Sequence, residues 1–262
     1  MRDQIKKRLC SIALLAHVDA GKTTLSEALL YVSGARRQLG RVDHRDAFLD
    51  THDLERSRGI TIFSKQARLE TSSRAVTLVD TPGHVDFSAE VERSLWALDA
   101  AVLVICGVEG VQPQTEVLFE ALSRQQVPTV IFINKTDLEG ADTQRVLRQI
   151  RRRLSPAAVM ADDDAAVTEA VCEQDDELLE RYLSGEAIEA ELIGNRFADL
   201  AQQGILYPVF TGSALRNEGV LAVLDAVVRF LPPPRDAGGL CGVAFAAQQH
   251  KVLGRGLWLR LY

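Results

Sequence analysis

From residue 9 to about residue 231, short apolar runs alternate with segments in which apolar residues recur every three or four positions. Runs rich in valine and isoleucine predict strands at residues 9–16, 76–79, 101–105, 129–133 and 207–210. Helical spacing occurs at residues 22–32, 86–98, 114–125, 141–154 and 217–231. Uninterrupted apolar strands suit a parallel sheet that is covered on both faces. The alternation therefore predicts an α/β fold with a doubly wound, mostly parallel sheet.

Three stretches depart from this rhythm and divide the chain. Residues 35–59 are polar and charged without a sustained period, which predicts a long mobile loop. Residues 155–205 predict an inserted subdomain whose second half forms two short helices. A triple proline follows the last helix, and two strands are expected within residues 242–262, which are too few to enclose a core. We therefore expect a first domain at residues 1–235 and the start of a truncated second β domain at residues 236–262.

Composition narrows the class of protein. The chain is 47% hydrophobic and 25% charged, as in ordinary globular domains, and its net charge of −6 creates no overall positive field that would attract nucleic acid. Four scattered cysteines favour buried, reduced thiols over a metal site or a disulfide framework. No signal peptide and no apolar run of membrane-spanning length is visible. We expect a cytoplasmic protein with no membrane partner and no autonomous nucleic-acid binding.

The segment AHVDAGKTT at residues 16–24 lies between a predicted strand and a predicted helix, which is the setting of a phosphate-binding loop. Backbone N–H groups in such a loop face phosphates. Lys22 would place its charge at the β- and γ-phosphates, and the Thr23 hydroxyl would ligate Mg²⁺. Ala16 stands where the first glycine is usual, and a chance match is the alternative. The expected nucleotide contacts in this segment are His17, Val18, Asp19, Ala20, Gly21, Lys22, Thr23 and Thr24.

A second motif, Asp80-Thr81-Pro82-Gly83, directly follows a predicted strand. A carboxylate at the carboxyl end of a strand points into the crevice where α/β proteins bind ligands, so Asp80 can hold Mg²⁺ through water. Gly83 lets its backbone N–H approach a γ-phosphate. A local turn with an Asp hydrogen bond is the alternative, which the place of the motif downstream of a phosphate loop disfavours.

A third motif, NKTD at residues 134–137, also follows a strand. Asp137 can accept hydrogen bonds from the N1–H and the exocyclic amine of guanine, a donor pair that adenine lacks. Asn134 would order the loop and meet the base edge, and the stem of Lys135 would cover the ring face. Helix capping is the alternative for such residues, but ordered motifs at successive strand ends favour guanine. A backbone N–H for the guanine carbonyl is expected from Ser213, Ala214 and Leu215.

Together these motifs resemble the GTPase domain of a translational GTPase. The resemblance rests on AHVDAGKTT (16–24), RGITI (58–62), DTPGHVDF (80–87), GVQPQT (110–115), NKTD (134–137) and GSAL (212–215), and it covers nearly the whole chain. Within that group the chain is most similar to tetracycline-resistance ribosomal protection proteins, with elongation factor G next. The resemblance implies a P-loop GTPase domain with a helical insertion, followed by the first strands of a truncated β-barrel domain.

The resemblance also implies a switch that depends on GTP and Mg²⁺. Thr61, within RGITI, would complete the metal ligands provided by Thr23 and Asp80 when the γ-phosphate is present. Loss of that phosphate would release residues 35–62, an order-to-disorder transition. The polar composition of this stretch suits a segment that needs a ligand in order to fold.

For catalysis, the resemblance assigns the main role to His84, which directly follows Gly83 and would position the attacking water. Lys22 would stabilise charge on the phosphates. Val18 and Ile60 would form an apolar gate that keeps His84 away until the ribosome engages. Asp19 would help to hold His84 or a monovalent cation.

The resemblance implies the ribosome as the partner of the full-length protein. Two other functions stay open, namely an elongation-factor-G-like translocase and a GTP-dependent conformational switch with little hydrolysis. The arginines near the end of the helix predicted at residues 141–154 are typical of a solvent-exposed face. A contact with the ribosome is the alternative.

Overall fold

The computed structural model describes residues 9–35, 65–71, 75–80, 95–230, 241–250 and 254–261. Its centre is a seven-stranded sheet of order β2-β3-β1-β4-β5-β7-β6. The strands are β1 (Leu9–Ala16), β2 (Lys65–Glu70), β3 (Ala75–Asp80), β4 (Ala100–Cys106), β5 (Thr129–Asn134), β6 (Ala158–Met160) and β7 (Tyr207–Thr211). All neighbouring pairs are parallel except β2–β3. The predicted α/β fold is confirmed, although β2 and β6 were not predicted.

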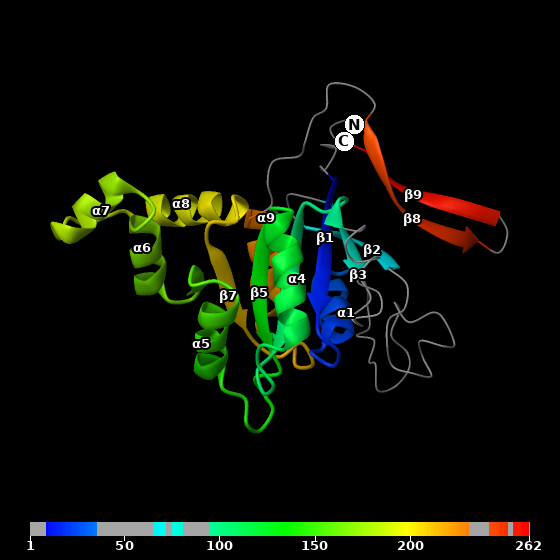
Figure 1. The fold of residues 1–262 in the computed structure, drawn as a ribbon, viewed down its shortest axis with the longest axis horizontal. Coiled ribbons are helices and arrows are strands. Elements are labelled where there is room, and N and C mark those ends of the chain that lie inside the picture. Colours follow the sequence, from blue (N-terminus) through cyan, green and yellow to red (C-terminus); the bar gives the residue numbers. More distant parts are fainter. Residues whose placement is uncertain are drawn as a thin grey trace.

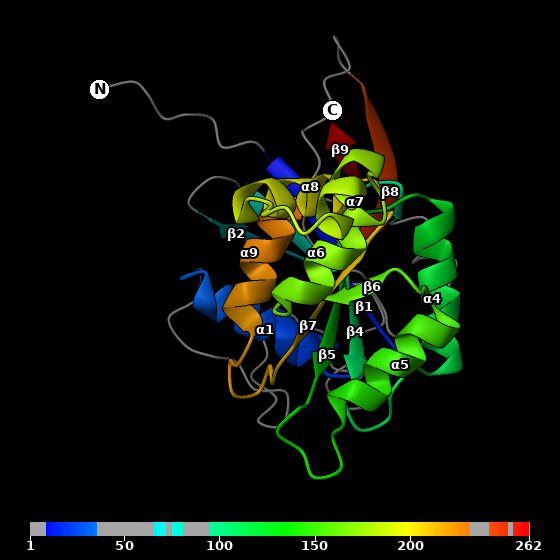
Figure 2. The same ribbon diagram turned by 90° about the vertical axis from the view of Figure 1, so that its left-hand side faces the viewer.

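Helices cover both faces of this sheet. They are α1 (Lys22–Val32), α4 (Pro113–Arg124), α5 (Thr143–Arg153) and α9 (Val220–Phe230). In Figure 2, α1 and α9 lie on one side of the sheet and α4 and α5 on the other. The helix expected at residues 86–98 and the loop expected at residues 35–59 lie almost entirely outside the described residues. No helix in the described part of the chain is long and apolar enough to span a membrane.

The core forms because neighbouring side chains of each central strand point to opposite faces of the sheet. In β1, Ile12 and Leu14 belong to the cluster under α1 and α9, whereas Ala13 and Leu15 belong to the cluster under α4 and α5. All seven residues of β4 are buried. A strand that is buried on both faces reads as a continuous apolar run, which is the pattern visible in the sequence.

Residues 155–205, which were expected to form an insertion, begin with the edge strand β6, which pairs in parallel with β7. Three helices follow, α6 (Asp164–Cys172), α7 (Asp176–Leu183) and α8 (Ala190–Gln202). In Figure 1, α6 and α7 lie to the left of β7, and α8 leads from α7 back towards α9. The acidic runs have a local role. Asp163 accepts a hydrogen bond from the Ala166 N–H, and Asp175 accepts one from Leu178, so each caps a helix start. Helices α7 and α8 match the two short helices that were expected, whereas α6 was not.

The cysteines are only partly as predicted. Cys10, Cys106 and Cys172 are buried free thiols, but Cys241 is exposed. Burial raises the pKa of the Cys172 thiol, and the Asp175 carboxylate adds to this effect. Both influences disfavour the thiolate, so Cys172 packs as a small apolar residue rather than as a nucleophile.

Beyond residue 240 the chain forms an antiparallel hairpin of β8 (Gly242–His250) and β9 (Gly254–Leu261), in agreement with the two strands expected there. Arg260 attaches the hairpin to the sheet. Its guanidinium donates to both carboxylate oxygens of Asp99 at 2.8 and 2.6 Å and to the Ala97 carbonyl at 2.9 Å. Asp99 also accepts from the Ser11 N–H of β1. These contacts lie at the amino ends of β1 and β4.

The first prediction concerns this attachment. Arg260 and Asp99 are only 11% and 9% exposed. Replacing Arg260 with alanine therefore leaves a mostly buried carboxylate without its cation, and we expect the free energy of unfolding to fall by about 3 kcal/mol. Urea denaturation measures the change. The control Arg124→Ala removes an exposed arginine at the end of α4 and should alter stability by no more than about 0.5 kcal/mol. Equal stability of the two variants would contradict the assignment.

Candidate functional site

Four loops gather at one edge of the sheet because parallel strands bring their carboxyl ends together. Residues 17–21 follow β1, 107–112 follow β4, 135–142 follow β5 and 212–219 follow β7. These strands are consecutive neighbours in the sheet. In open α/β sheets this edge is where ligands bind, and three of the four loops contain residues of the predicted nucleotide site.

The first loop has the backbone of an anion-binding turn. Asp19 and Gly21 adopt positive φ angles of 63° and 93°. Gly21 is the N-cap of α1 and has no side chain with which to cap the first helical turn, which is the setting in which helix N-termini bind anions. Lys22 is buried, Thr23 and Thr24 are half-buried, and Val18 and Asp19 are exposed. A Cβ at Gly21 would lie 2.4 Å from Asn134 Nδ2, so the loop requires glycine there for space as well as for conformation.

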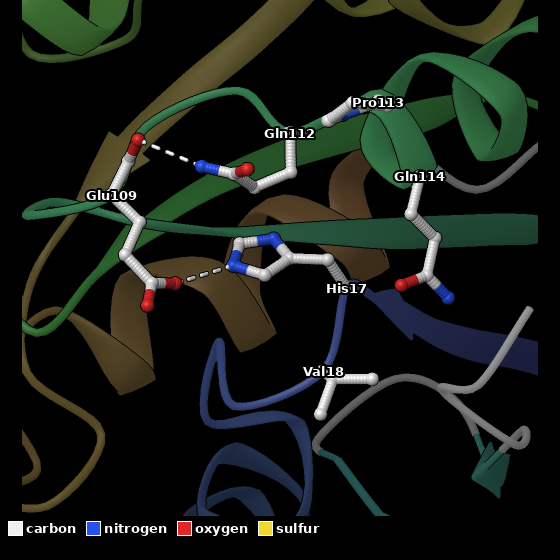
Figure 3. A pocket seen from close by; sticks show the side chains of 6 residues that line it. All are labelled: His17, Val18, Glu109, Gln112, Pro113 and Gln114. Atoms are coloured by element: carbon white, nitrogen blue, oxygen red, sulfur yellow. Dashed lines mark hydrogen bonds and ion pairs between the residues drawn. The ribbon is translucent and has the colours of Figure 1, made fainter.

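His17 was predicted to contact the nucleotide, and its ring is engaged within the protein (Figure 3). Nε2 lies 2.9 Å from the Glu109 carboxylate, and Nδ1 lies 3.4 Å from the Thr115 hydroxyl. An ionised Glu109 carboxylate can only accept, so the hydrogen bond at Nε2 assigns a ring proton to that nitrogen, and in this tautomer Nδ1 accepts from the Thr115 hydroxyl. The ring therefore links the first loop to the start of α4.

A cavity of about 480 Å³ opens beside this link. Its described lining consists of His17, Val18, Glu109, Gln112, Pro113 and Gln114. Gln112 is the N-cap of α4 and forms a capping box with Thr115. The capped start of α4 therefore forms one wall of the cavity. The exposed Val18 side chain forms part of another wall.

The Asn134 side chain joins three of the four loops. Its Nδ2 donates to the Ala20 carbonyl at 2.9 Å, and its Oδ1 accepts from the Ala214 N–H at 2.9 Å. Asn134 is 2% exposed, so water is a poor substitute for either partner. We call this pair of bonds the Asn134 clasp. Asparagine suits the end of β5 because its side-chain amide carries a donor and an acceptor on separate atoms.

The residues predicted to read the base lie on the loops that follow β5 and β7, which are two of the three loops that the clasp joins. Lys135 has a positive φ of 62°, and its Cε would lie 3.7 Å from a Cβ at Gly21, which places its stem beside the phosphate loop. The Asp137 side chain is 7% exposed, and its Oδ2 is 3.4 Å from Arg216 Nε. Ser213 and Ala214 are buried, while Leu215 is half exposed.

The predicted metal ligands are only partly described. Thr23 lies in the first turn of α1, and Asp80 ends β3, where its Cα is in register with Leu14 of β1. Thr61, Gly83 and His84 lie outside the described residues, and so does Ile60 of the predicted gate. The described structure therefore brings together the phosphate loop and the base-reading loops.

Sequence reasoning missed three residues of this edge: Glu109, Thr115 and Arg216. Glu109 precedes the GVQPQT segment, and Thr115 ends it, so the segment was noted without a role for its side chains. A glutamate and a threonine contact a histidine about 90 residues earlier. Contacts between segments so far apart follow from the sheet order, which local patterns do not contain.

The second prediction tests the Asn134 clasp. Replacing Asn134 with alanine leaves the Ala20 carbonyl and the Ala214 N–H buried without partners, and we expect the free energy of unfolding to fall by about 2 kcal/mol or more. Chemical denaturation in the absence of nucleotide gives the value. The control Asn195→Ala changes an exposed asparagine of α8 and should shift stability by about 0.5 kcal/mol at most. A loss no larger than that of the control would mean that the clasp contributes little.

Comparison with known proteins agrees with this geometry. The tetracycline resistance protein TetW of Butyrivibrio fibrisolvens is 43% identical over 97% of this chain, and TetM from transposon Tn916 of Enterococcus faecalis is 39% identical over the same share. The chain spans 42% of the length of each. A crystal structure of a protein from Thermus thermophilus superposes with a TM-score of 0.85 at 29% identity, covering 97% of this chain and 45% of that one. The family model of the elongation factor Tu GTP binding domain matches residues 7–233, and the chain belongs to this family.

Proposed function

We propose that this chain binds GTP with Mg²⁺ and hydrolyses it as the GTPase domain of a ribosome-dependent protein of the tetracycline ribosomal protection type. The observation that carries the proposal is the Asn134 clasp, which holds a phosphate loop against two loops suited to a guanine base. Membership of a GTP-binding family supports the same conclusion. The residues proposed to contact the nucleotide are His17 to Thr24, Thr61, Gly83, Asn134, Lys135, Asp137, Ser213, Ala214 and Leu215.

In the proposed complex, Asp137 accepts from N1–H and the 2-amino group of guanine, and adenine leaves its carboxylate unpaired. The Ser213 N–H donates to Glu218, and the Ala214 N–H donates to Asn134. This leaves the Leu215 N–H as the donor in this loop for the guanine carbonyl. The position of Lys135 beside the phosphate loop supports its proposed role of covering one face of the base.

Magnesium would shield the phosphate charge, with Thr23, Thr61 and Asp80 as its proposed ligands. A hydroxyl in the first turn of α1 and a carboxylate at the end of β3 supply oxygen donors, which this cation prefers. Asp19, exposed next to Val18, is proposed to hold His84 or a monovalent cation.

For hydrolysis, we propose that His84 orients the attacking water and that Lys22 stabilises charge on the phosphates. Val18 and Ile60 would form the apolar gate between His84 and the nucleotide. The exposure of Val18 on the cavity wall is the supporting observation, since a gate residue must be accessible to a moving partner.

The identity to TetW and TetM supports ribosomal protection as the role of the full-length protein, with the ribosome as its partner. We further propose that residues 1–235 form the GTPase domain, with the 155–205 segment as its insertion, and that the β8–β9 hairpin begins a second β domain. An elongation-factor-G-like translocase is the second candidate, because the sequence motifs of this chain resemble elongation factor G next after the protection proteins.

The third prediction addresses the base. Because adenine lacks the donor pair that Asp137 accepts, ATP should compete at least a hundredfold less well than GTP or GDP for a fluorescent guanine nucleotide, which corresponds to about 3 kcal/mol. Asp137→Ala should remove most of this preference. The exposed Asp199 of α8 provides a matched control, Asp199→Ala, with the preference unchanged. Equal competition by ATP against the unaltered chain would refute the proposed base recognition.

The fourth prediction addresses hydrolysis. His84→Ala should leave GTP affinity within about twofold while lowering ribosome-stimulated phosphate release in the full-length protein by at least a hundredfold, the scale of losing a positioned catalytic group. Unchanged stimulated release would remove His84 from the mechanism. Absence of stimulated release in the unaltered full-length protein would instead favour a conformational switch. Protection of translation from tetracycline by the unaltered protein distinguishes ribosomal protection from translocation.

A further inference from the structure

An ion pair joins the loops at residues 135–142 and 212–219, which carry the residues proposed to read the base. One member of the pair, Arg216, has no role in the proposed function. Two hydrogen bonds that involve backbone groups connect these loops, namely the Ala214 N–H to Asn134 Oδ1 at 2.9 Å and the Thr136 N–H to the Gly212 carbonyl at 3.2 Å. The third contact, between Arg216 Nε and Asp137 Oδ2 at 3.4 Å, joins only side chains. Arg216 can therefore be replaced while both backbone connections remain.

The backbone that carries Arg216 is fixed independently of its side chain. Ser213 and Glu218 exchange N–H to carbonyl bonds at 3.1 and 2.9 Å across the turn. The Arg216 N–H donates to Ser213, and Asn217 closes the turn with a φ of 59°. The Arg216 side chain itself is 58% exposed. A substitution at this position is consequently expected to change the charge beside Asp137 rather than the fold.

The partner of Arg216 is in a different environment. The Asp137 side chain is 7% exposed, so protein rather than water provides most of its surroundings. Arg216 Nε lies 3.4 Å from its Oδ2, which is within the range of an ion pair but longer than a normal hydrogen bond. An ionised carboxylate has about four lone-pair sites, so a contact at Oδ2 leaves sites for the two N–H donors of guanine.

We propose that Arg216 is a positioning residue for guanine recognition. Its guanidinium holds the Asp137 carboxylate in the orientation in which both oxygens meet the base edge, which strengthens the discrimination that depends on two donors. This inference rests on the proposed role of Asp137. Arg216 itself touches the carboxylate and not the reacting phosphates.

The test compares GTP with ITP, whose base retains N1–H but lacks the 2-amino group. Both are measured by displacement of a fluorescent guanine nucleotide at fixed Mg²⁺. In Arg216→Ala we expect GTP affinity to fall about threefold, the scale of a partly exposed ion pair. ITP affinity should fall less, so the GTP-to-ITP preference shrinks. Arg216→Lys retains the positive charge and should keep most of the GTP-to-ITP preference. Arg216→Gln removes the charge and should not keep it.

Two controls isolate the effect. Arg148→Ala removes an exposed arginine of α5 outside both loops and should leave the GTP-to-ITP preference unchanged. In an Asp137→Ala background, Arg216→Ala should have no further effect on the preference, because Arg216 acts through that carboxylate.

Three results would overturn the inference: an unchanged preference in Arg216→Ala, tighter GTP binding in that variant, or a full effect in the absence of Asp137. Tighter binding would mean that the arginine competes with the base. Failure of the proposed function has a separate signature, since the unaltered chain would then bind ATP as well as it binds GTP.

Discussion

The nucleotide edge of this molecule depends on one amide side chain. Asn134 ends β5 and binds the carbonyl of Ala20 and the N–H of Ala214, so three loops from three strands share a single anchor. Each of these groups is buried and would cost free energy if left unpaired. The sheet brings the loops to the same edge, but the amide sets their separation. A second, independent link through the His17 ring extends the arrangement to the 109–115 loop.

Much of the fold was accessible from the sequence, because the central strands are buried on both faces. Their apolar runs are continuous, and the helices between them have a clear apolar stripe, so β1, β4, β5 and α1 were predicted nearly to the residue. Strand β6 escaped because three residues are too short to establish a period. Strand β2, KQARLE, alternates polar and apolar residues at an edge of the sheet, where only one face needs apolar side chains.

The residues of the candidate site likewise fall into those that the sequence predicted and those that it did not. Residues within short motifs were found because their spacing encodes local backbone geometry, as in the loop that ends at Gly21. Contacts across the sheet edge were not found, because they depend on which strands are neighbours. Helix α5 illustrates the point. Arg148 and Arg151 to Arg153 are exposed, as expected for a solvated face, but the bond from Arg145 to the Gly107 carbonyl depends on the neighbouring loop after β4 and was not expected.

The place where the β8–β9 hairpin is attached determines how changes in the hairpin affect the rest of the molecule. Arg260 holds the amino ends of β1 and β4, and the nucleotide loops follow the carboxyl ends of the same strands. The length of the sheet thus separates the joint from the chemistry. Changes elsewhere in the hairpin are therefore expected to leave the nucleotide loops in place, provided that the cation at position 260 and the carboxylate at position 99 are both present.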